Sequence, residues 1–366
     1  MRVALVCTGL GRILRGFESF TESLFQALSK YAPDVDVTLF QGGGRVGERR
    51  RVIPNFHRYD LPARWMGYDK GNMLEKRSFA LALYPFLRRG KFDIVHYNEL
   101  VMGNTLYHLR RFFGGNYKLL YCGGSTWFPA HYGHRCDYAQ LLTAPMYEDA
   151  LAFGIPEARV FLIPYGLDVK QFSTCSRAER ASVRAELRIP DNARVVLTVA
   201  NLDRETKRID YLIHELSKMD QPVWLLAAGQ KTPDTPGLEQ EAEHFLAGRW
   251  RFVSWPQNRV HLLYGAADMF VLTSLVEAFG RVIIEALLTG LPTIVHDGPI
   301  FKWVTEGSLA ETIDMSVEGR LADAMIQHFH FQRRTNGNSR DIVVNRFGWK
   351  NLITQYIDMY EKAARA

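Results

Sequence analysis

Residues 273–290 read TSLVEAFGRVIIEALLTG, and this stretch says most about the fold. The apolar residues directly before it have the composition of a buried strand, and Gly280 permits a tight turn. Residues 282–288 are apolar on nearly every side, so the helix after the turn is expected to be buried. The stretch therefore predicts a strand, a turn and a buried helix, with Glu277 before the helix and Glu285 inside it.

A carboxylate inside an apolar helix needs a partner, because burying its charge without a hydrogen bond costs free energy. Arg281 lies one helical turn before Glu285 on the same face and offers an ion pair. A ligand diol is the alternative partner, since two neighbouring hydroxyls fit the two carboxylate oxygens. The residues alone leave both alternatives open.

The start of the same helix provides further ligand groups. The backbone N–H groups of Gly280 and its neighbours begin the helix, and the positive end of a helix favours a phosphate. Glu277 stands just before them, eight residues ahead of Glu285. Two acids and a set of amides thus converge, which predicts a pocket for a sugar nucleotide.

This arrangement resembles the Glu-x7-Glu signature of the retaining glycosyltransferases of family 4, the glycosyl transferases group 1. Residues 262–274, LLYGAADMFVLTS, are similar to the family pattern L..LY..AD.FV.PS, and residues 289–295, TGLPTIV, to A.G.PVVA. Residues 163–172, IPYGLDVKQF, are similar to the IPNGVD...F that closes the first domain, with Tyr165 in place of Asn. The resemblance covers about the whole chain and is strongest from 160 to 305.

The resemblance implies the GT-B architecture, an α/β fold with two facing Rossmann-like domains, parallel sheets and a cleft between them. A chain of 366 residues with 47% apolar and 23% charged residues fits two soluble globular domains. Strand-like apolar runs alternate with helical patterns along the chain, which independently predicts parallel sheets covered by helices.

We expect the domain boundary after Phe172, where a short polar segment leads into a charged helix. Residues 1–172 would form an N-terminal acceptor-binding domain, and residues 173–345 a C-terminal domain that binds the nucleotide-sugar. The resemblance further implies that the terminal helix, within 346–366, crosses back to the N-terminal domain.

The composition also limits where the protein acts. The apolar runs are shorter than the roughly 18 residues that a membrane span needs. The four cysteines lack C-x-x-C spacing and are too sparse for a disulfide framework, so a reduced, cytoplasmic protein is expected. The Asp34-Val35-Asp36 triplet imitates a metal-binding motif, but it precedes the second strand, and the resembled family generally needs no metal. We therefore expect no metal and no cofactor.

The net charge of +6 is unevenly placed. Residues 45–91 hold twelve Lys or Arg residues against four Asp or Glu residues, a local excess of +8. Such a run is often only a solvated face. The alternative is a patch that attracts anions, which includes peripheral contact with an anionic membrane at its inner face. Nucleic acid is not expected, because no DNA-reading helix, zinc finger or RNA-binding signature accompanies the charge.

A polar loop follows the first strand expected in the second domain. In the resembled family, an Arg and a Lys six residues apart neutralise the donor pyrophosphate in this loop. Lys207 matches the Lys, Asn201 occupies the Arg position, and Arg204 or Arg208 is expected to substitute. Cations placed in advance there would stabilise the negative charge that builds up on the leaving phosphate.

Two glycine-rich places mark the first domain. Gly16-Phe17-Glu18 is similar to the family's GG.E, where the first loop approaches the donor, although a pure turn role is an equal alternative. After the strand at 118–122, Gly123 occupies the place of a family His that faces the donor sugar. Backbone amides of Gly123 and Gly124, or a histidine from elsewhere, would then act on the acceptor side. The histidines considered are His96, which is also compatible with a structural role, and the pair His131 and His134.

We therefore expect an enzyme that moves a hexose from a UDP-, GDP- or ADP-sugar to a glycan, a lipid-linked acceptor or a small molecule, and the resemblance implies that the configuration is retained. Glu277, Lys207 and Arg204 are the expected catalytic residues. The alternatives are a GT-B sugar-nucleotide epimerase, a phosphorylase, or a non-catalytic binding protein. The expected donor-binding residues are Glu285, Gly280, Phe279, Ala278, Arg281, Gly16 and Asn201.

Overall fold

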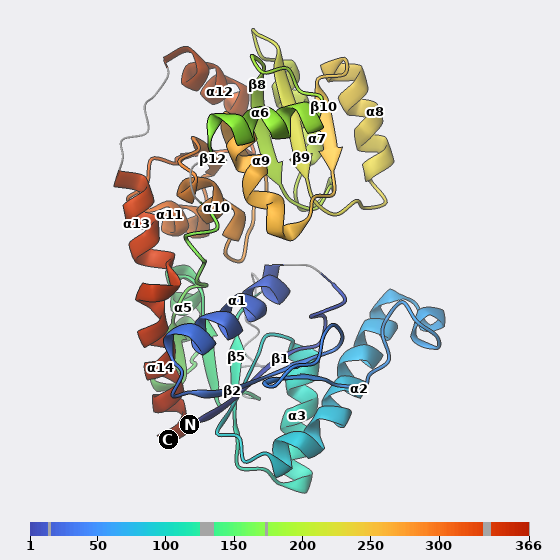
Figure 1. Ribbon diagram of the computed structural model, residues 1–366, viewed down its shortest axis with the longest axis vertical. Helices are drawn as coiled ribbons and strands as arrows, with labels where there is room; N and C mark the ends of the chain where they lie inside the picture. Colours follow the sequence, from blue (N-terminus) through green and yellow to red (C-terminus); the bar gives the residue numbers. More distant parts are fainter. Residues whose placement is uncertain (14–15, 125–134, 173–174, 332–337, 366) are drawn as a thin grey trace. The chain divides into compact units, whose positions relative to one another are not determined.

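The computed structural model describes residues 1–13, 16–124, 135–172, 175–331 and 338–365, and it divides into two units (Figure 1). Unit 1 comprises Met1–Leu167 and Phe347–Ala366, and unit 2 comprises Asp168–Arg346. The chain thus passes between units inside the segment 163–172. Each unit contains one parallel sheet with helices, which confirms the predicted pair of Rossmann-like domains.

The sheet of unit 1 has seven parallel strands in the order β3-β2-β1-β4-β5-β6-β7. Its central strands are covered on both faces, since β1 is buried from Val3 onward and β4 is buried throughout. The order reverses between β1 and β4, so the loops that follow these two strands lie side by side at the carboxyl edge. The strands are β1 (Arg2–Cys7), β2 (Asp36–Gln41), β3 (Arg50–Val52), β4 (Ile94–Tyr97), β5 (Lys118–Cys122), β6 (Tyr138–Leu141) and β7 (Val160–Leu162).

The last helix of the chain belongs to unit 1 and packs on α1, β4 and β5. Trp349 Nε1 donates a hydrogen bond to Ser23 Oγ at 2.6 Å, and Tyr356 Oη donates to Pro164 O at 2.9 Å. The helices of unit 1 are α1 (Gly16–Tyr31), η1 (Ala63–Met66), α2 (Tyr68–Arg89), α3 (Leu100–Phe113), α5 (Ala144–Ala152), η2 (Glu157–Arg159) and α14 (Trp349–Arg365).

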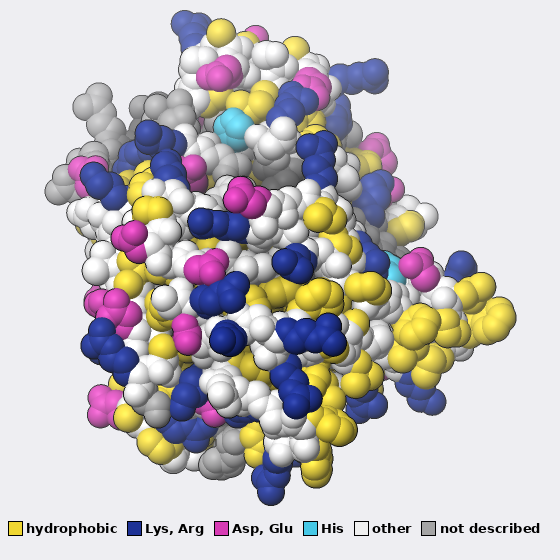
Figure 2. All heavy atoms as spheres, turned by 60° about the horizontal axis from the view of Figure 1, so that its bottom comes forward, with side chains coloured by type: hydrophobic (Ala, Val, Ile, Leu, Met, Phe, Trp, Pro, Cys, Tyr) yellow, Lys and Arg dark blue, Asp and Glu magenta, His cyan; other side chains and the backbone are white. Residues whose placement is uncertain are grey.

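Large hydrophobic side chains are exposed on η1 and beside it, at the edge of unit 1 that projects to the right in Figures 1 and 2. Leu61 is 59% exposed, Trp65 81% and Met66 46%. The segment is nevertheless held firmly, because the buried Arg58 donates from Nε to Glu75 of α2 at 2.5 Å. A buried ion pair therefore fixes a segment that leaves its own apolar side chains exposed to water.

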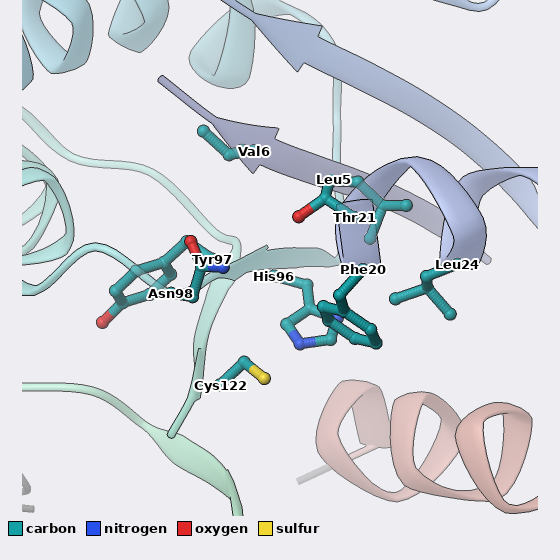
Figure 3. A pocket seen from close by; sticks show the side chains of 9 residues that line it. All are labelled: Leu5, Val6, Phe20, Thr21, Leu24, His96, Tyr97, Asn98 and Cys122. Atoms are coloured by element: carbon teal, nitrogen blue, oxygen red, sulfur yellow. The ribbon is translucent and has the colours of Figure 1, made fainter. Parts of the chain in front are cut away.

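His96 of β4 lies in the core of unit 1, between Phe20 of α1 and Cys122 of β5 (Figure 3). The side chain is 3% exposed, and Nδ1 shares a hydrogen bond of 2.8 Å with Tyr360 Oη of α14. Burial lowers the pKa of His96 to about 3, so the imidazole is neutral. The cavity beside it measures only about 10 Å³, which is room for roughly one water molecule.

The sheet of unit 2 has six parallel strands in the order β10-β9-β8-β11-β12-β13. The order reverses between β8 and β11, so the loops after these two strands are neighbours at the carboxyl edge, where ligands bind in open α/β sheets. The strands are β8 (Arg194–Val199), β9 (Val223–Ala228), β10 (Trp250–Val253), β11 (Met269–Leu272), β12 (Thr293–His296) and β13 (Glu311–Ile313).

The helices of unit 2 cover its sheet, and the first of them begins with a capping box in which Ser176 and Glu179 bond each other's backbone N–H. The predicted strand, turn and buried helix of residues 269–288 appear as β11, a loop and α10. The helices are α6 (Arg177–Glu186), α7 (Ile209–Ser217), α8 (Thr235–Leu246), η3 (Gln257–Arg259), α9 (Val260–Ala266), α10 (Arg281–Leu288), α11 (Pro299–Thr305), α12 (Arg320–Phe331) and α13 (Asn338–Phe347).

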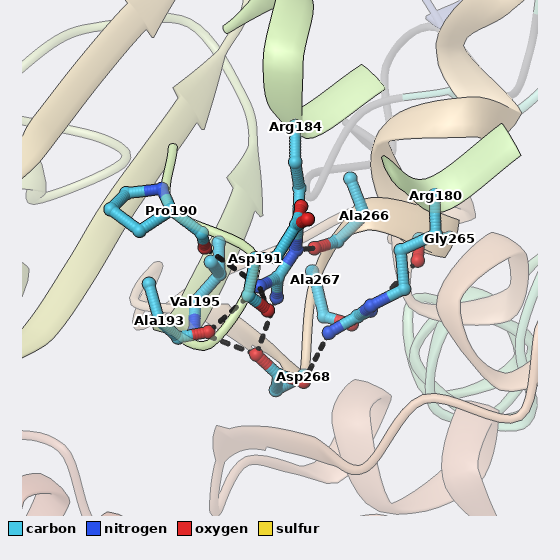
Figure 4. A network of polar contacts seen from close by, with 10 residues as sticks. All are labelled: Arg180, Arg184, Pro190, Asp191, Ala193, Val195, Gly265, Ala266, Ala267 and Asp268. Carbon is cyan, nitrogen blue, oxygen red and sulfur yellow. Dashed lines mark hydrogen bonds and ion pairs between the residues drawn. The ribbon is translucent and has the colours of Figure 1, made fainter. Parts of the chain in front are cut away.

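A buried arginine ties α6 to the strands that carry the reversal in unit 2 (Figure 4). Arg184 is 1% exposed, and its Nη2 donates to Asp268 Oδ2 at 2.9 Å. Arg184 Nε donates to Ala266 O at 2.9 Å, and the same Asp268 oxygen accepts from the backbone N–H of Val195 at 2.9 Å. This network joins the start of β8 to the start of β11 and so sets their register.

Candidate functional site

The loops that follow β8 and β11 are joined to each other. Thr273, the first residue after β11, is fully buried, and its Oγ1 donates to Lys207 O at 2.6 Å. Because Lys207 belongs to the loop after β8, this bond fixes one loop against the other. The side chains that the two loops carry therefore meet at the point where the strand order reverses.

Lys207 and Glu277, two of the three predicted catalytic residues, are in contact. Lys207 Nζ donates to Glu277 Oε1, and the side chains are 22% and 14% exposed. The pair is largely screened from water, so its charges interact more strongly than a surface pair would. The structure thus places a cation and a carboxylate next to the amino end of α10.

An aspartate that sequence reasoning missed shapes the loop after β8. Asp203 Oδ1 accepts from the backbone N–H groups of Thr206 at 2.7 Å and Lys207 at 2.8 Å. An Asp that bonds the backbone a few residues later is a common turn device, and the Asp-x-x-Thr spacing was its available signal. This turn presents the Lys207 side chain toward Glu277.

The other predicted cations of this loop have different partners. Arg204 Nη2 pairs with Glu241 of α8 at 2.8 Å, and this hydrogen bond raises the pKa of the arginine. Arg208 Nη1 donates to Met315 O at 2.9 Å. Asn201 is exposed at the start of the loop. The structure therefore brings Lys207 to Glu277 and holds Arg204 on α8.

Glu285 is buried in α10, with 5% exposure, and it has a protein partner that the sequence did not indicate. Tyr264 Oη of α9 donates to Glu285 Oε2 at 2.8 Å. Burial raises the pKa of the Glu285 carboxyl, while the charge of Arg281 and the Tyr264 bond act in the opposite direction. Tyr264 is thus a third partner for Glu285, in addition to the two alternatives considered from the sequence, Arg281 and a ligand.

The turn before α10 has the backbone geometry that its glycine allows. Gly280 precedes the helix with a φ of 72°, a left-handed conformation that disfavours any side chain. Phe279 is buried and Ala278 is half-buried. Among the described residues, the buried Ser274 Oγ has no hydrogen-bond partner. Sequence reasoning did not name Ser274 as a site residue. The turn leaves backbone amides at the start of α10, where Gly280 stands three residues after Glu277 in the chain.

The site residues predicted in unit 1 lie at separate places, and the structure does not bring them together. Gly16 begins α1, with open space where a Cβ would lie. Gly123 follows β5 and donates from its backbone N–H to Gln140 O at 2.8 Å, and Gly124 is half-buried. His96 lies in the core, as described above, which favours its structural alternative over an acceptor-side role. His131 and its neighbour His134 lie outside the described residues.

The part of the chain that the structure describes contains no group of three or more His, Cys, Asp or Glu side chains arranged to hold a metal ion. None of its helices combines the length and the apolar character that crossing a membrane requires. Metal independence and the absence of a cofactor remain predictions.

Comparison with known proteins finds a family model that matches part of unit 2. Residues 179–312, all within unit 2, match the family model described as "Glycosyl transferases group 1". The alpha-galactosylglucosyldiacylglycerol synthase of Streptococcus pneumoniae is 23% identical over 247 residues, which cover 63% of this chain and 62% of that protein. The match thus spans somewhat less than two thirds of that relative.

Solved structures extend the similarity to the whole chain. Sucrose-phosphate synthase of Thermosynechococcus elongatus superposes with a TM-score of 0.80 at 22% identity, over 99% of this chain and 98% of that one. HepE of Anabaena, solved in complex with UDP and glucose, superposes with a TM-score of 0.78 at 17% identity, over 99% of each chain. Both likenesses concern the fold, and they confirm the predicted GT-B architecture. Residues 179–312 of this chain are thus similar to the glycosyl transferases group 1, and the chain as a whole has the GT-B fold.

Proposed function

We propose that this protein is a retaining glycosyltransferase that moves a hexose from a nucleotide-sugar to an acceptor. The observation that carries the proposal is the contact between Lys207 and Glu277 at the amino end of α10, where the strand order of unit 2 reverses. A cation, a carboxylate and helix-start amides at a switch point suit a sugar attached to a phosphate. The family match of the same residues supports this assignment.

The proposed roles combine the position of each group with the resemblance to the family described above. Lys207 neutralises the charge that develops on the leaving phosphate, together with the amides at Gly280. Glu277 accepts hydrogen bonds from the sugar hydroxyls. Glu285 binds the ribose hydroxyls through the oxygen that Tyr264 does not occupy. Arg204 would assist with the pyrophosphate only after leaving Glu241, so we assign it a secondary part.

In the proposed reaction, the bond from the anomeric carbon to the phosphate oxygen breaks, and a bond from the same carbon to an acceptor oxygen forms. The acceptor hydroxyl gives its proton to the departing phosphate oxygen on the same face of the sugar. No protein carboxylate then serves as the nucleophile. The donor is a UDP-, GDP- or ADP-linked hexose, and the acceptor is a glycan, a lipid-linked sugar or a small molecule.

Product analysis tests this function. The full chain is incubated with each donor and a panel of acceptors, and NMR of the product gives its anomeric configuration. A glycoside with the configuration of the donor supports the proposal. An inverted glycoside contradicts retention, while an epimerised donor or a sugar 1-phosphate identifies one of the alternative enzymes.

Mutations separate the site from the rest of unit 2. Lys207→Ala should lower the rate of transfer by roughly 10²-fold or more, whereas Lys231→Ala should leave it unchanged, since Lys231 forms its ion pair with Glu239, at 2.8 Å, on the surface. Both changes remove one lysine and one ion pair from the same unit, so loss of transfer in both would indicate instability instead of a lost catalytic group.

We further propose that region 45–91 contacts an anionic membrane from the cytoplasmic side. The exposed Leu61, Trp65 and Met66 support this, because aromatic and apolar side chains favour the membrane interface, and basic residues of the same region attract anionic lipids. The free thiols of all four cysteines fit a reducing compartment.

Sedimentation with vesicles tests the membrane proposal. Trp65→Ser should reduce binding to vesicles that contain phosphatidylglycerol, whereas Phe112→Ser, at a 73% exposed aromatic of α3 outside the region, should not. Equal losses in the two variants would contradict a specific contact through region 45–91.

A further inference from the structure

A cavity of about 340 Å³ lies in unit 1, between the last turns of α2 and the strands β1 to β3. Its size falls within the range of small-molecule sites. Three phenylalanines and three arginines dominate its lining: Phe40, Phe86, Phe92, Arg2, Arg51 and Arg89. The cavity therefore combines aromatic rings, which can hold an apolar group, with guanidinium groups, which can hold an anion.

The short strand β3 shows how one arginine comes to face this cavity. Adjacent residues of a strand point to opposite faces of the sheet. Arg50 points to α1, where Nη1 donates to Glu22 Oε2 at 2.7 Å. Arg51 points to α2, where its guanidinium lies 5.9 Å from the ring centre of Phe86. The fold thus supplies a carboxylate for Arg50 and an aromatic ring for Arg51.

The charges of the cavity are only partly neutralised. Arg2 pairs with Asp36 at 2.8 Å and also donates to Gly90 O, so its guanidinium is fixed and compensated. Within the described ranges, no acidic side chain forms an ion pair with Arg51 or Arg89. Two guanidinium groups without a carboxylate partner therefore share one cavity with three phenylalanine rings, an arrangement that suits an oxyanion.

Helix α2 contains two adjacent arginines that can be compared, one that lines the cavity and one that does not. Arg88 and Arg89 both lie in the last turn of α2, where cations favour the helix dipole, and both are exposed. Neighbouring residues of a helix project about 100° apart, so the two side chains point in different directions. Only Arg89 lines the cavity.

The cavity is separate from the residues proposed for transfer. Arg2 opens β1, while the loop with Gly9 and Gly16 follows the carboxyl end of that strand, about 17 Å away along six residues. No lining residue belongs to unit 2. A ligand here would not occupy the donor site, so this inference stands or falls independently of the proposed transferase function.

We propose that this cavity binds an oxyanion carried on an apolar body, with Arg51 and Arg89 holding the anion and the phenylalanine rings holding the body. A phosphate ester with an aromatic or hydrocarbon substituent has this chemistry. It can come from a soluble organic phosphate or from the headgroup and first carbons of a lipid. The apolar wall would give such an ester an advantage over inorganic phosphate.

Calorimetric titration of the full chain with 1-naphthyl phosphate and with inorganic phosphate tests the site. The wild type and Arg88→Ala should bind naphthyl phosphate equally and more tightly than inorganic phosphate. Arg51→Ala and Arg89→Ala should each weaken binding roughly tenfold or more, because each removes a charged hydrogen-bond donor. Phe86→Ala should remove the preference for the naphthyl ester.

Three results would overturn the proposal. They are the absence of saturable binding, an equal loss in Arg88→Ala, and loss of binding in Lys207→Ala, which would place the ligand at the donor site. Sedimentation with phosphatidylcholine vesicles, with and without phosphatidic acid, shows whether the phosphate ester is a lipid headgroup or a soluble organic phosphate. Binding that depends on phosphatidic acid, Arg51 and Arg89 identifies a lipid headgroup, and binding of soluble esters alone identifies a free organic phosphate.

Discussion

Lys207 Nζ contacts Glu277 Oε1 across two loops that leave neighbouring strands of unit 2, seventy residues apart in the chain. The two residues are too far apart in the chain for a local motif to bring them together. Thr273 and Asp203 bring them together, one by joining the loops and the other by shaping the turn that carries the lysine. The proposed chemistry depends on this contact.

Lys207→Ala and Glu277→Ala should each lower kcat/KM with the preferred donor by roughly 10²-fold or more, because each removes a preorganised charge from the developing phosphate or the sugar. The double variant should lose little more than the worse single variant, since residues that act as a unit are not additive. Initial rates of donor consumption measure this. Wild-type rates in either single variant would contradict the assigned roles.

Glu285→Gln should alter the pH dependence of stability. Burial raises the pKa of Glu285 above 4.5, so above that pH the folded chain keeps a proton that the unfolded chain has released. Folding stability therefore falls as pH rises through the interval up to the raised pKa. The glutamine variant lacks this loss, so urea unfolding should show that its stability rises relative to that of the wild type as the pH increases above 4.5. Parallel curves for the two proteins would contradict the buried carboxylate.

His96→Asn should separate a core histidine from an acceptor-side one. The folded pKa of His96 is lowered to about 3, so the wild type loses stability as pH falls from about 6.5 toward 3, where only the unfolded chain takes up the proton. The asparagine variant should lose less over that range, and its transfer activity at pH 7 should be retained. Loss of activity with an unchanged pH profile would instead favour a role at the acceptor.

Arg184→Leu should destabilise unit 2 by about 3–5 kcal/mol, because Asp268 and several carbonyl groups lose a buried guanidinium. Arg180→Leu should cost less, since the side chain of Arg180 is 30% exposed and water can replace part of its contacts. Urea unfolding of the two variants provides the comparison. Equal losses would show that the buried network does not set the register of β8 and β11.

Apolar runs in the sequence predict most of the strands, but three strands lack an apolar run that would reveal them. β3 and β13 are edge strands of three residues, and their polar composition reflects a position with a neighbour on one side only. β6 lies inside its sheet but contains Gln140, whose buried amide donates to Ile163 O and to Tyr356 Oη. A polar residue in a buried strand is acceptable only because of those distant partners, which the local pattern does not reveal.

The candidate site likewise contains residues that the sequence predicts and partners that it does not. Glu277, Gly280, Glu285 and Lys207 stand in motifs that can be read from the sequence, and the structure joins Lys207 to Glu277. Tyr264 could not be assigned to Glu285, because their contact joins α9 to α10 across β11. The partner of Arg204 was equally hidden, since Glu241 belongs to a helix one strand further on.

Binding of nucleotide-sugars to unit 2 is the most direct test of the account. Thermal unfolding is followed with a panel of UDP-, GDP- and ADP-sugars, where a ligand at 100 times its Kd adds about 2.7 kcal/mol of stability. We predict that one donor class stabilises the wild type and Lys231→Ala, and stabilises Lys207→Ala and Glu285→Ala much less. No stabilisation by any donor, or equal stabilisation of all four proteins, would contradict the proposed site.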